Sequence, residues 1–364
     1  MLELRSPERA FERIEGWLRE RGFFAADGSG DDLVADVYLG YGLSEPLRRS
    51  PVPAPPERCP ALPLAAVSIR RDTVAVSGRG QSAGLSPARF GQWERSWSAA
   101  EYARAVEEVR DAIARGDVYQ VNLVQHLEAP FGGDAVALVS SLARFRPLAP
   151  FLEGDGWAVV SASPELFLAR RGRRVLTMPI KGTRPLGEHV EGEKDEAEHL
   201  MIVDLERNDL SRVCVPGSVR WPELMREREL AGVTHLVSRI EGELREGVGL
   251  AELLAATFPG GSVTGAPKLA ALDEIARLEP VGRGASMGAL GWVRGNGDLE
   301  LALTIRTFAI AAGRIHLWVG GGVVWDSDPA DEVEESWTKA RPLLAAVGAP
   351  LDGLVLKQHK VGSR

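Results

Sequence analysis

Hydrophobic and polar positions follow clear periods from about residue 95 onward. Ser98 and Glu101 have the spacing of a capping box, and apolar residues then recur at helical spacing up to Gly116. A glycine is a frequent stop signal, so the pattern predicts a helix that ends there. The same period predicts further helices over 193–211, 250–257, 267–277 and 331–346.

Alternation with a period of two predicts strands between these helices. In the segment VYQVNLVQHLE, Tyr119, Val121 and Leu123 alternate with polar residues. Because the strands come in runs rather than in strict alternation with helices, the pattern favours an α+β fold with largely antiparallel sheets over a doubly wound sheet. The other predicted strands lie over 157–171, 174–185, 288–295, 301–310 and 315–324.

The first 95 residues are less regular. The opening sequence MLELRSPERAFERIEGW has a charged helix pattern, and the segment 46–63 holds seven of the 23 prolines. Proline fixes φ, so this segment is expected to be a stiff connector, either a domain boundary or an exposed loop. Together with the clearer periods after about residue 95, this divides the chain into an N-terminal region over 1–90, a main region over 91–350 and a short tail over 351–364.

Composition narrows the class of protein. Of 364 residues, 45% are hydrophobic and 26% are charged, as in soluble globular proteins. The net charge of −8, without a basic stretch, argues against a nucleic acid partner. No apolar run approaches the roughly 18 residues of a membrane helix. Two cysteines, Cys59 and Cys214, lack metal-ligand spacing and suggest a reducing compartment, so we expect a cytoplasmic protein.

Two carboxylate pairs have a spacing that suits a metal ion. Asp195 and Glu198 are three residues apart on one predicted helix, and Glu332 and Glu335 repeat this spacing on another. Oxygen ligands from two helices could hold a hard cation such as Mg²⁺. The alternative is a pair of solvated charged faces.

The segment FPGGSVTGAPK, which opens a predicted helix, is a candidate anion site. Its glycines, Gly261 among them, let backbone N–H groups approach a negative charge beside Ser262, and a helix N-terminus also favours such a charge. The sequence lacks the Lys-Ser/Thr of a nucleotide loop, so a carboxylate or another small anion fits better. The alternative is a tight turn with a helix cap.

Two further positions carry candidate chemistry. Gly320, Gly321 and Gly322 interrupt a strand, which marks either close approach of a ligand or a bulge or barrel corner. Lys181 follows an apolar run and precedes a glycine, so burial could make its amine a nucleophile. The alternative for Lys181 is an ordinary surface lysine.

In order along the chain, these motifs closely resemble those of the chorismate-utilising enzymes. That family includes anthranilate, aminodeoxychorismate, isochorismate and salicylate synthases, and the resemblance runs from about residue 95 to 345. It implies two packed antiparallel sheets with helices on the outside, and a reduced N-terminal region. The motifs are VYQVNLVQ, SASPELF, MPIKGTRP, AEHLMIVDLERNDLSRV, VTHLVS, FPGGSVTGAPK, TIRTF and GGGVVWDSDP.

Two positions discriminate among members of the family. Isochorismate and salicylate synthases use a lysine to activate water where this chain has Gln120, which cannot serve as that base. Aminodeoxychorismate synthases have PIKGT, as here with Lys181, whereas anthranilate synthases have alanine in place of the lysine. The resemblance thus implies a transferase that makes 4-amino-4-deoxychorismate for p-aminobenzoate and folate.

The resemblance also implies roles for particular residues. Lys181 would form a covalent adduct with chorismate, and Glu165 would act as acid and base, which requires a pKa near neutral and partial burial. Glu198 and Glu335 would bind Mg²⁺, with Asp195 and Glu332 holding its waters. The expected substrate-binding residues are Gln120, Thr183, His235, Gly261, Ser262, Trp292, Thr304, Arg306, Gly321, Gly322 and Lys339.

Partners and alternatives follow from the same comparison. The chain has no glutaminase nucleophile, so ammonia is expected from solution or from a separate glutamine amidotransferase subunit. Trp292 stands where the family is expected to have tyrosine. The alternatives are anthranilate synthase component I and a relative that binds chorismate without turnover.

Overall fold

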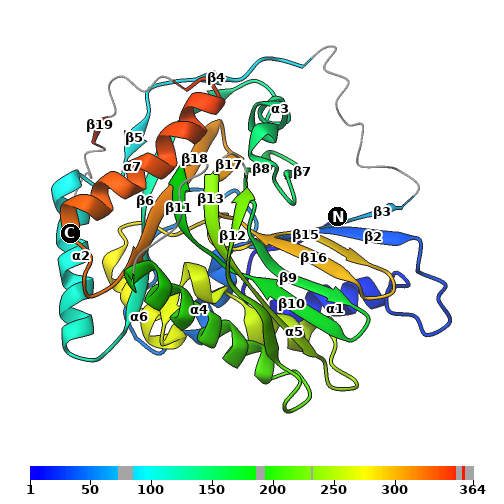
Figure 1. Cartoon of the computed structure of the whole chain (residues 1–364). Coiled ribbons are helices and arrows are strands. Elements are labelled where there is room, and N and C mark those ends of the chain that lie inside the picture. The colour runs from blue at the N-terminus through cyan, green and yellow to red at the C-terminus, as the bar shows by residue number, and fades with distance from the viewer. Residues whose placement is uncertain (73–84, 186–192, 231–232, 350–354, 357–364) are drawn as a thin grey trace.

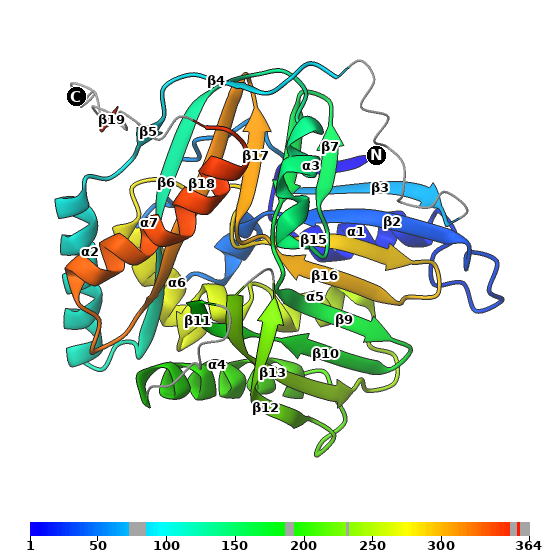
Figure 2. The same ribbon diagram turned by 45° about the horizontal axis from the view of Figure 1, so that its top comes forward.

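The computed structural model describes residues 1–72, 85–185, 193–230, 233–349 and 355–356. Their strands form two sheets, which confirms the expected α+β fold with antiparallel sheets. β19 and β5 form the one parallel pair among the strand pairs of the described residues. Figure 2 shows the strands of the two sheets crossing at a steep angle.

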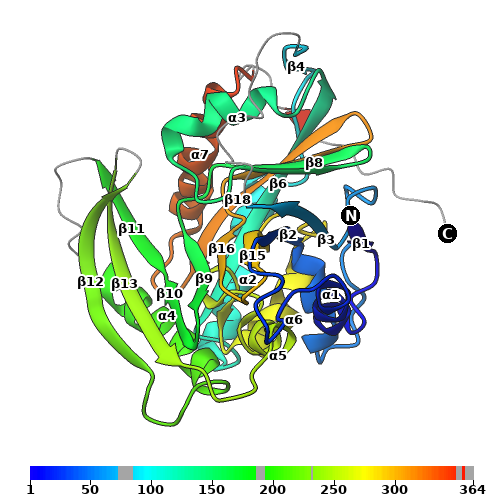
Figure 3. The ribbon, with the colours of Figure 1, turned by 90° about the vertical axis from the view of Figure 1, so that its right-hand side faces the viewer.

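One sheet has ten strands among the described residues, in the order β1-β3-β2-β15-β16-β9-β10-β13-β11, with β12 beside β13. The long hairpin of β12 and β13 stands out at one side in Figure 3. The strands are β1 (Leu2–Leu4), β2 (Leu33–Leu39), β3 (Ala65–Arg71), β9 (Leu166–Arg171), β10 (Arg174–Met178), β11 (Ile180–Pro185), β12 (Arg220–Leu230), β13 (Val233–Glu243), β15 (Ala289–Arg294) and β16 (Leu299–Leu303).

The second sheet has nine strands among the described residues, in the order β19-β5-β6-β18-β17-β8-β7, with β14 and β4 also beside β6. The strands are β4 (Arg89–Phe90), β5 (Glu94–Arg95), β6 (Gln120–Gly132), β7 (Phe151–Gly154), β8 (Trp157–Ser161), β14 (Gly265–Ala266), β17 (Thr307–Ala311), β18 (Arg314–Val323) and β19 (Val355–Leu356).

Helices cover the outside of the sheets, as Figure 1 shows. α7 packs on β18, α4 on β13, and α1 on α5. The helices are α1 (Ala10–Arg19), α2 (Ala99–Ala114), α3 (Ala137–Leu142), α4 (Glu193–Ser211), α5 (Leu250–Thr257), α6 (Lys268–Leu278) and α7 (Pro329–Ala346), with 3₁₀ turns η1 (Tyr41–Leu47), η2 (Ala143–Phe145) and η3 (Gly261–Val263).

The helix predictions agree with the structure to within two residues at most ends. α2 begins after the capping box of Ser98 and Glu101, in which both reciprocal hydrogen bonds form. α4 and α5 have the predicted bounds. The N-terminal helix prediction was too long, because residues 2–4 form β1 and pair with β3.

Two predicted strands are each divided by a crossing between the sheets. The segment 157–171 forms β8 in one sheet and β9 in the other, and 301–310 falls into β16 and β17 in the same way. The hydrophobic pattern could not show the break, because β8, β9, β16 and β17 are all largely buried. A third predicted strand, 174–185, is β10 and β11 of one sheet.

The N-terminal region contributes to the main sheet. β2 pairs with β15 from Val34 to Leu39, so residues before 90 and after 91 share a sheet. The proline-rich segment is exposed at first and anchored at its end, where Cys59 is buried and Arg58 donates to Glu128 across 3.1 Å. The domain boundary at residue 90 remains a prediction.

Candidate active site

The two crossings between the sheets bring together residues that are far apart in sequence. Glu165 precedes β9 at the first crossing, and Arg306 lies between β16 and β17 at the second. The amide of Leu303 donates to the carbonyl of Glu165 across 3.0 Å, which joins the two crossings. Arg306 has a φ of 52°, a left-handed conformation that a non-glycine residue rarely adopts.

The carboxyl of Glu165 is buried, with 4% of its surface exposed. Ser262 Oγ donates a hydrogen bond to Glu165 Oε1 across 2.8 Å. Burial raises the pKa of Glu165, while the Ser262 hydrogen bond and the charges of Lys181 and Arg306 oppose the rise. The sequence predicted a partly buried acid, and the side chain of Glu165 is almost completely buried.

Lys181 lies on β11, opposite Leu236 of β13. A side chain at Gly322 would overlap the amide nitrogen of Gln120, and its Cβ would lie 3.4 Å from Lys181 Nζ. Gln120 is fully buried, and its amide atoms have no hydrogen-bond partner among the described residues. The side chains of Lys181 and Gln120 therefore both approach the backbone of β18 at Gly322, where a larger residue would require Gln120 to move.

His235 on β13 lies beside this group. Its Nδ1 is 2.8 Å from the carbonyl oxygen of Gly182, which follows Lys181. Burial lowers the pKa of His235, and the charge of Arg306 lowers it further. A neutral imidazole at this place can orient a ligand without adding charge.

Gly261 and Ser262 form the short η3 turn, which packs against α4. A Cβ at Gly261 would lie 2.8 Å from Leu205 and 3.5 Å from Glu206. The sequence missed Glu206, which is buried, accepts a 2.7 Å hydrogen bond from Thr177 and has a pKa raised to about 8 by burial. Glu206, Thr177 and Gly261 line a small cavity behind the turn.

The carboxylates of α7 meet the backbone at Gly321. A Cβ there would lie 3.1 Å from Glu335 Oε1 and 3.2 Å from Glu332 Oε2. Lys339 pairs with Glu335 at 2.6 Å and donates to the carbonyl of Gly320 at 2.8 Å. These hard oxygen donors suit Mg²⁺.

The other expected ligands come from α4. Glu198 is partly exposed on this helix, and the Asp195 side chain lies outside the described part of the chain. The Thr183 side chain also lies outside it. The ligand set on the two helices is consistent with Mg²⁺ in its chemistry and remains a prediction.

One buried group of His and Glu side chains was not expected. His126, Glu128 and His316 have potential metal-ligating atoms within 4.8 Å of one another. Arg58 and Arg314 donate to the two oxygens of Glu128 across 3.1 and 3.0 Å. Because two guanidinium groups already neutralise the carboxylate, we interpret this group as a hydrogen-bonded network of the core.

Two expected substrate residues have other contacts. The buried hydroxyl of Thr304 donates to the carbonyl of Ala285 at 2.5 Å and accepts from the amide of Gly288 at 2.8 Å. Arg171 and Arg294 place their guanidinium carbons 4.9 and 5.3 Å from the centre of the Trp292 ring.

The position of Trp292 along the sheet sets it apart from the crossing, and its role in substrate binding remains a prediction. Ala289 lies opposite Leu303, the residue bonded to Glu165, whereas Trp292 lies opposite Glu300. Three residues along a strand correspond to about 10 Å, so Trp292 is displaced from the crossing. Ser286, before β15, is fully buried, and its hydroxyl has no hydrogen-bond partner among the described residues. The sequence gave no signal for it.

Comparison with known proteins identifies the class. Residues 67–345 match the family described as chorismate binding enzyme, and the chain belongs to that family. It is 38% identical over 334 residues to anthranilate synthase component 1 of Streptomyces coelicolor, which covers 87% of this chain and 60% of the relative. It is 37% identical over 269 residues to aminodeoxychorismate synthase component 1 of Bacillus subtilis, which covers 70% of this chain and 57% of the relative.

A solved structure agrees with this assignment. The anthranilate synthase component I of Streptococcus pneumoniae superimposes with a TM-score of 0.73 at 26% identity, over 85% of this chain and 80% of that chain. The chain spans about 60% of the length of the first curated relatives it matches. No helix in the described part of the chain is long and apolar enough to cross a membrane.

Proposed function

We propose that the protein is component I of an aminodeoxychorismate synthase, which converts chorismate and ammonia to 4-amino-4-deoxychorismate. The observation that carries the proposal is the position of Lys181, beside Gln120 at Gly322 and close enough to Glu165 to affect the pKa of its carboxyl. A primary amine next to a buried acid can support a covalent route.

Each step of this route balances. The neutral amine of Lys181 attacks C2 of chorismate and becomes a secondary ammonium, both conjugated ring double bonds shift towards C4, and the C4 hydroxyl leaves as water with a proton from Glu165. Ammonia then adds at C4, both double bonds shift back, and the C2–N bond breaks so that Lys181 leaves as the neutral amine. The Glu165 carboxylate takes the proton that ammonia loses, so one residue serves as acid and then as base.

Other side chains would bind the substrate. Arg306 and the backbone near Gly321 would hold a carboxylate of chorismate, since a guanidinium can bind a carboxylate through two hydrogen bonds. Glu198 and Glu335 would hold Mg²⁺ directly, with Asp195 and Glu332 on its waters. The bound ion would supply charge neutralisation for the ring carboxylate.

The relatives support a second candidate. Anthranilate synthase component 1 of Streptomyces coelicolor aligns over 87% of this chain, against 70% for the Bacillus subtilis aminodeoxychorismate synthase. Such an enzyme would add ammonia at C2 and release pyruvate. Lys181 favours the first candidate, because an amine at C2 would block that position to ammonia. The intact pair of Lys181 and Glu165 likewise argues against a protein that binds chorismate without turnover.

Ammonia would reach the site from a separate glutamine amidotransferase subunit or from solution. The product would be a precursor of p-aminobenzoate and folate, and we propose that the enzyme works in the cytoplasm.

Identification of the product tests the proposal. The purified chain is incubated with chorismate, Mg²⁺ and ammonium at mildly alkaline pH, and the products are separated and weighed by mass spectrometry. A product that retains the enolpyruvyl group and carries an amine that NMR places on C4 supports the proposal, whereas an amine on C2 would overturn it. Fluorescent anthranilate, formed with pyruvate, would overturn it, and binding without turnover would favour the non-catalytic relative.

A further inference from the structure

Two buried ion pairs lie at the two ends of the Gly-Gly-Ser turn. At the first end, Lys268 Nζ lies 2.5 Å from Asp209 Oδ2 and donates to the carbonyls of Thr257 at 3.1 Å and Pro259 at 2.7 Å. The two charged side chains are 11% and 8% exposed. The pair therefore holds the chain that enters the turn against α4.

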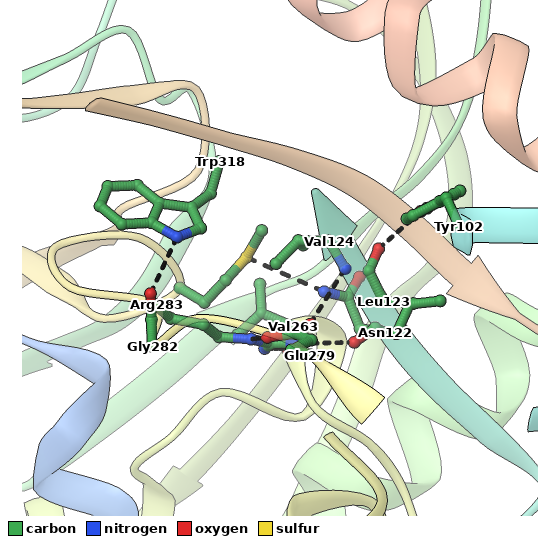
Figure 4. Close-up of polar contacts among 10 residues, drawn as sticks. Tyr102, Asn122, Leu123, Val124, Val263, Glu279, Gly282, Arg283 and Trp318 are labelled. Carbon is green, nitrogen blue, oxygen red and sulfur yellow. Dashed lines mark hydrogen bonds and ion pairs between the residues drawn. The ribbon is translucent and has the colours of Figure 1, made fainter. Parts of the chain in front are cut away.

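At the second end, Arg283 binds the backbone of the turn as Lys268 does at the first end (Figure 4). It donates to the carbonyls of Val263 at 2.9 Å and Asn122 at 2.6 Å, and it pairs with Glu279 at 2.7 Å. Glu279 Oε1 in turn accepts from the amide of Val124 at 3.0 Å. This pair ties the end of the turn to β6, the strand that carries Gln120.

Burying these ion pairs costs desolvation free energy, which indicates that they do more than stabilise the fold. The side chains of Arg283 and Glu279 are 1% and 2% exposed, so both charges are removed from water. Well-packed apolar residues often give at least equal stability in such a place. A buried pair adds directed hydrogen bonds, and here three of them end on backbone atoms of the turn and of β6.

Ser262 lies between the two anchored ends. Its hydroxyl donates to Glu165 Oε1 across 2.8 Å. Gly260 and Gly261 precede it, and glycine has more backbone freedom than any other residue. The turn also packs on Leu205, and Thr264 donates to the carbonyl of Gly260. The anchors at Pro259 and Val263 therefore act together with these contacts to place the hydroxyl.

We propose that Lys268 and Arg283 are positioning residues that hold the Ser262 hydroxyl on the Glu165 carboxylate during the reaction. The inference rests on the proposed function in one respect, the role of Glu165 as acid and base. The positive charges of Lys181 and Arg306 also lower the pKa of Glu165. The charge of Glu165 in turn raises the pKa of Glu206 on α4.

The test uses the pH dependence of chorismate consumption, which does not depend on which product forms. Arg283→Lys keeps the charge but loses the planar set of donors, and Lys268→Met removes the other anchor. In both variants, the pH limb that reports Glu165 is expected to move to higher pH by about half to one unit, because the hydrogen bond to its carboxylate weakens. Arg277→Lys is the matched control, since Arg277 pairs with Glu274 on the same helix and is 39% exposed.

A double-mutant cycle with Ser262→Ala separates positioning from general support. If Arg283 acts through Ser262, Arg283→Lys should produce no further shift in the Ser262→Ala background. A shift that adds in full, or a lower melting temperature with an unmoved pH limb, would overturn the proposal.

Two further measurements separate loss of folding from loss of positioning, and failure of the proposed function from failure of this inference. Thermal unfolding is recorded for each variant, and Glu279→Gln replaces Arg283→Lys if the latter does not fold. The pH dependence of chorismate affinity, measured by calorimetry, reports Glu165 even without turnover. Anthranilate as product would therefore overturn the proposed function and leave the cycle interpretable.

Discussion

The hydroxyl of Ser262 and the carboxylate of Glu165 are joined by a 2.8 Å hydrogen bond, although the residues are 97 positions apart in the chain. The bond joins the glycine-rich turn to the point where the chain passes from one sheet to the other. It also lowers the pKa of a carboxyl whose burial raises it. The chemistry of Glu165 therefore depends on both segments.

Ser262→Ala should move the titration of Glu165 to higher pH. The variant loses a hydrogen bond to a charged group, and a loss of about 1.5 kcal/mol corresponds to roughly one pH unit. The limb assigned to Glu165 in the pH profile of chorismate consumption measures the shift. Ser44→Ala, which removes a buried hydroxyl bonded to the carbonyl of Tyr41, is the control. An unchanged limb in Ser262→Ala would remove this hydrogen bond from the mechanism.

Much of the fold could be predicted from the sequence, because long helices and strands have strong hydrophobic periods. α4 and α5 were predicted to the residue. The crossings at Glu165 and Arg306 could not be, since the chain is apolar on both sides of each crossing and only the pairing of strands separates the sheets. The hairpin of β12 and β13 was also missed.

In the candidate site too, the sequence predicted some residues and missed others. Lys181, Gln120 and Glu165 were recognised because they lie in motifs that resemble a family. The role of Trp292 stays a prediction, because a motif fixes the position of a residue along the strand but not its distance from the site. Arg283 gave no signal, since its contacts are with backbone atoms of segments distant in sequence.

Lys181→Ala should abolish the covalent adduct and lower the turnover of chorismate by ~10³-fold or more, as loss of a nucleophile typically does. Intact mass spectrometry of the enzyme quenched during turnover, without ammonium, measures the adduct as the mass of chorismate less one water. Lys181→Arg is the control, because it keeps the positive charge but supplies no neutral amine. Unchanged kinetics in Lys181→Ala would exclude the lysine as nucleophile.

Gly322→Ala should displace Gln120. The added methyl group would overlap the Gln120 amide, and it would lie 3.4 Å from Lys181 Nζ. We expect kcat/KM for chorismate to fall on the order of 100-fold, the effect of a small misplacement in an active site. Gly16→Ala is the matched control, because a Cβ at Gly16 in α1 has nothing within 4 Å. Equal activity of the two variants would contradict the close approach.

Glu335→Gln should weaken Mg²⁺ binding. A neutral amide is a poorer ligand for a hard cation than a carboxylate. The Mg²⁺ concentration for half-maximal activity should rise at least about tenfold, as it does even when partners of metal ligands are changed. Glu334→Gln is the control, since Glu334 is exposed and pairs with Arg341 at 2.5 Å. Calorimetric titration with Mg²⁺ gives a second measure, and equal affinities in the two variants would exclude Glu335 as a ligand.

Glu206→Gln should change how stability depends on pH. Burial raises the pKa of Glu206 from 4.5 to about 8, so between these values the folded protein keeps a proton that the unfolded chain has lost. The free energy of unfolding of the wild type therefore falls as pH rises through this window, by up to about 1.4 kcal/mol per unit from this group. Glu206→Gln cannot ionise, so its stability relative to the wild type should increase from about pH 5.5 to about pH 7.5 in urea denaturation. Asp204→Asn, an exposed change on the same helix, should give no such trend. A constant difference between wild type and Glu206→Gln would mean that Glu206 is ionised in the folded protein.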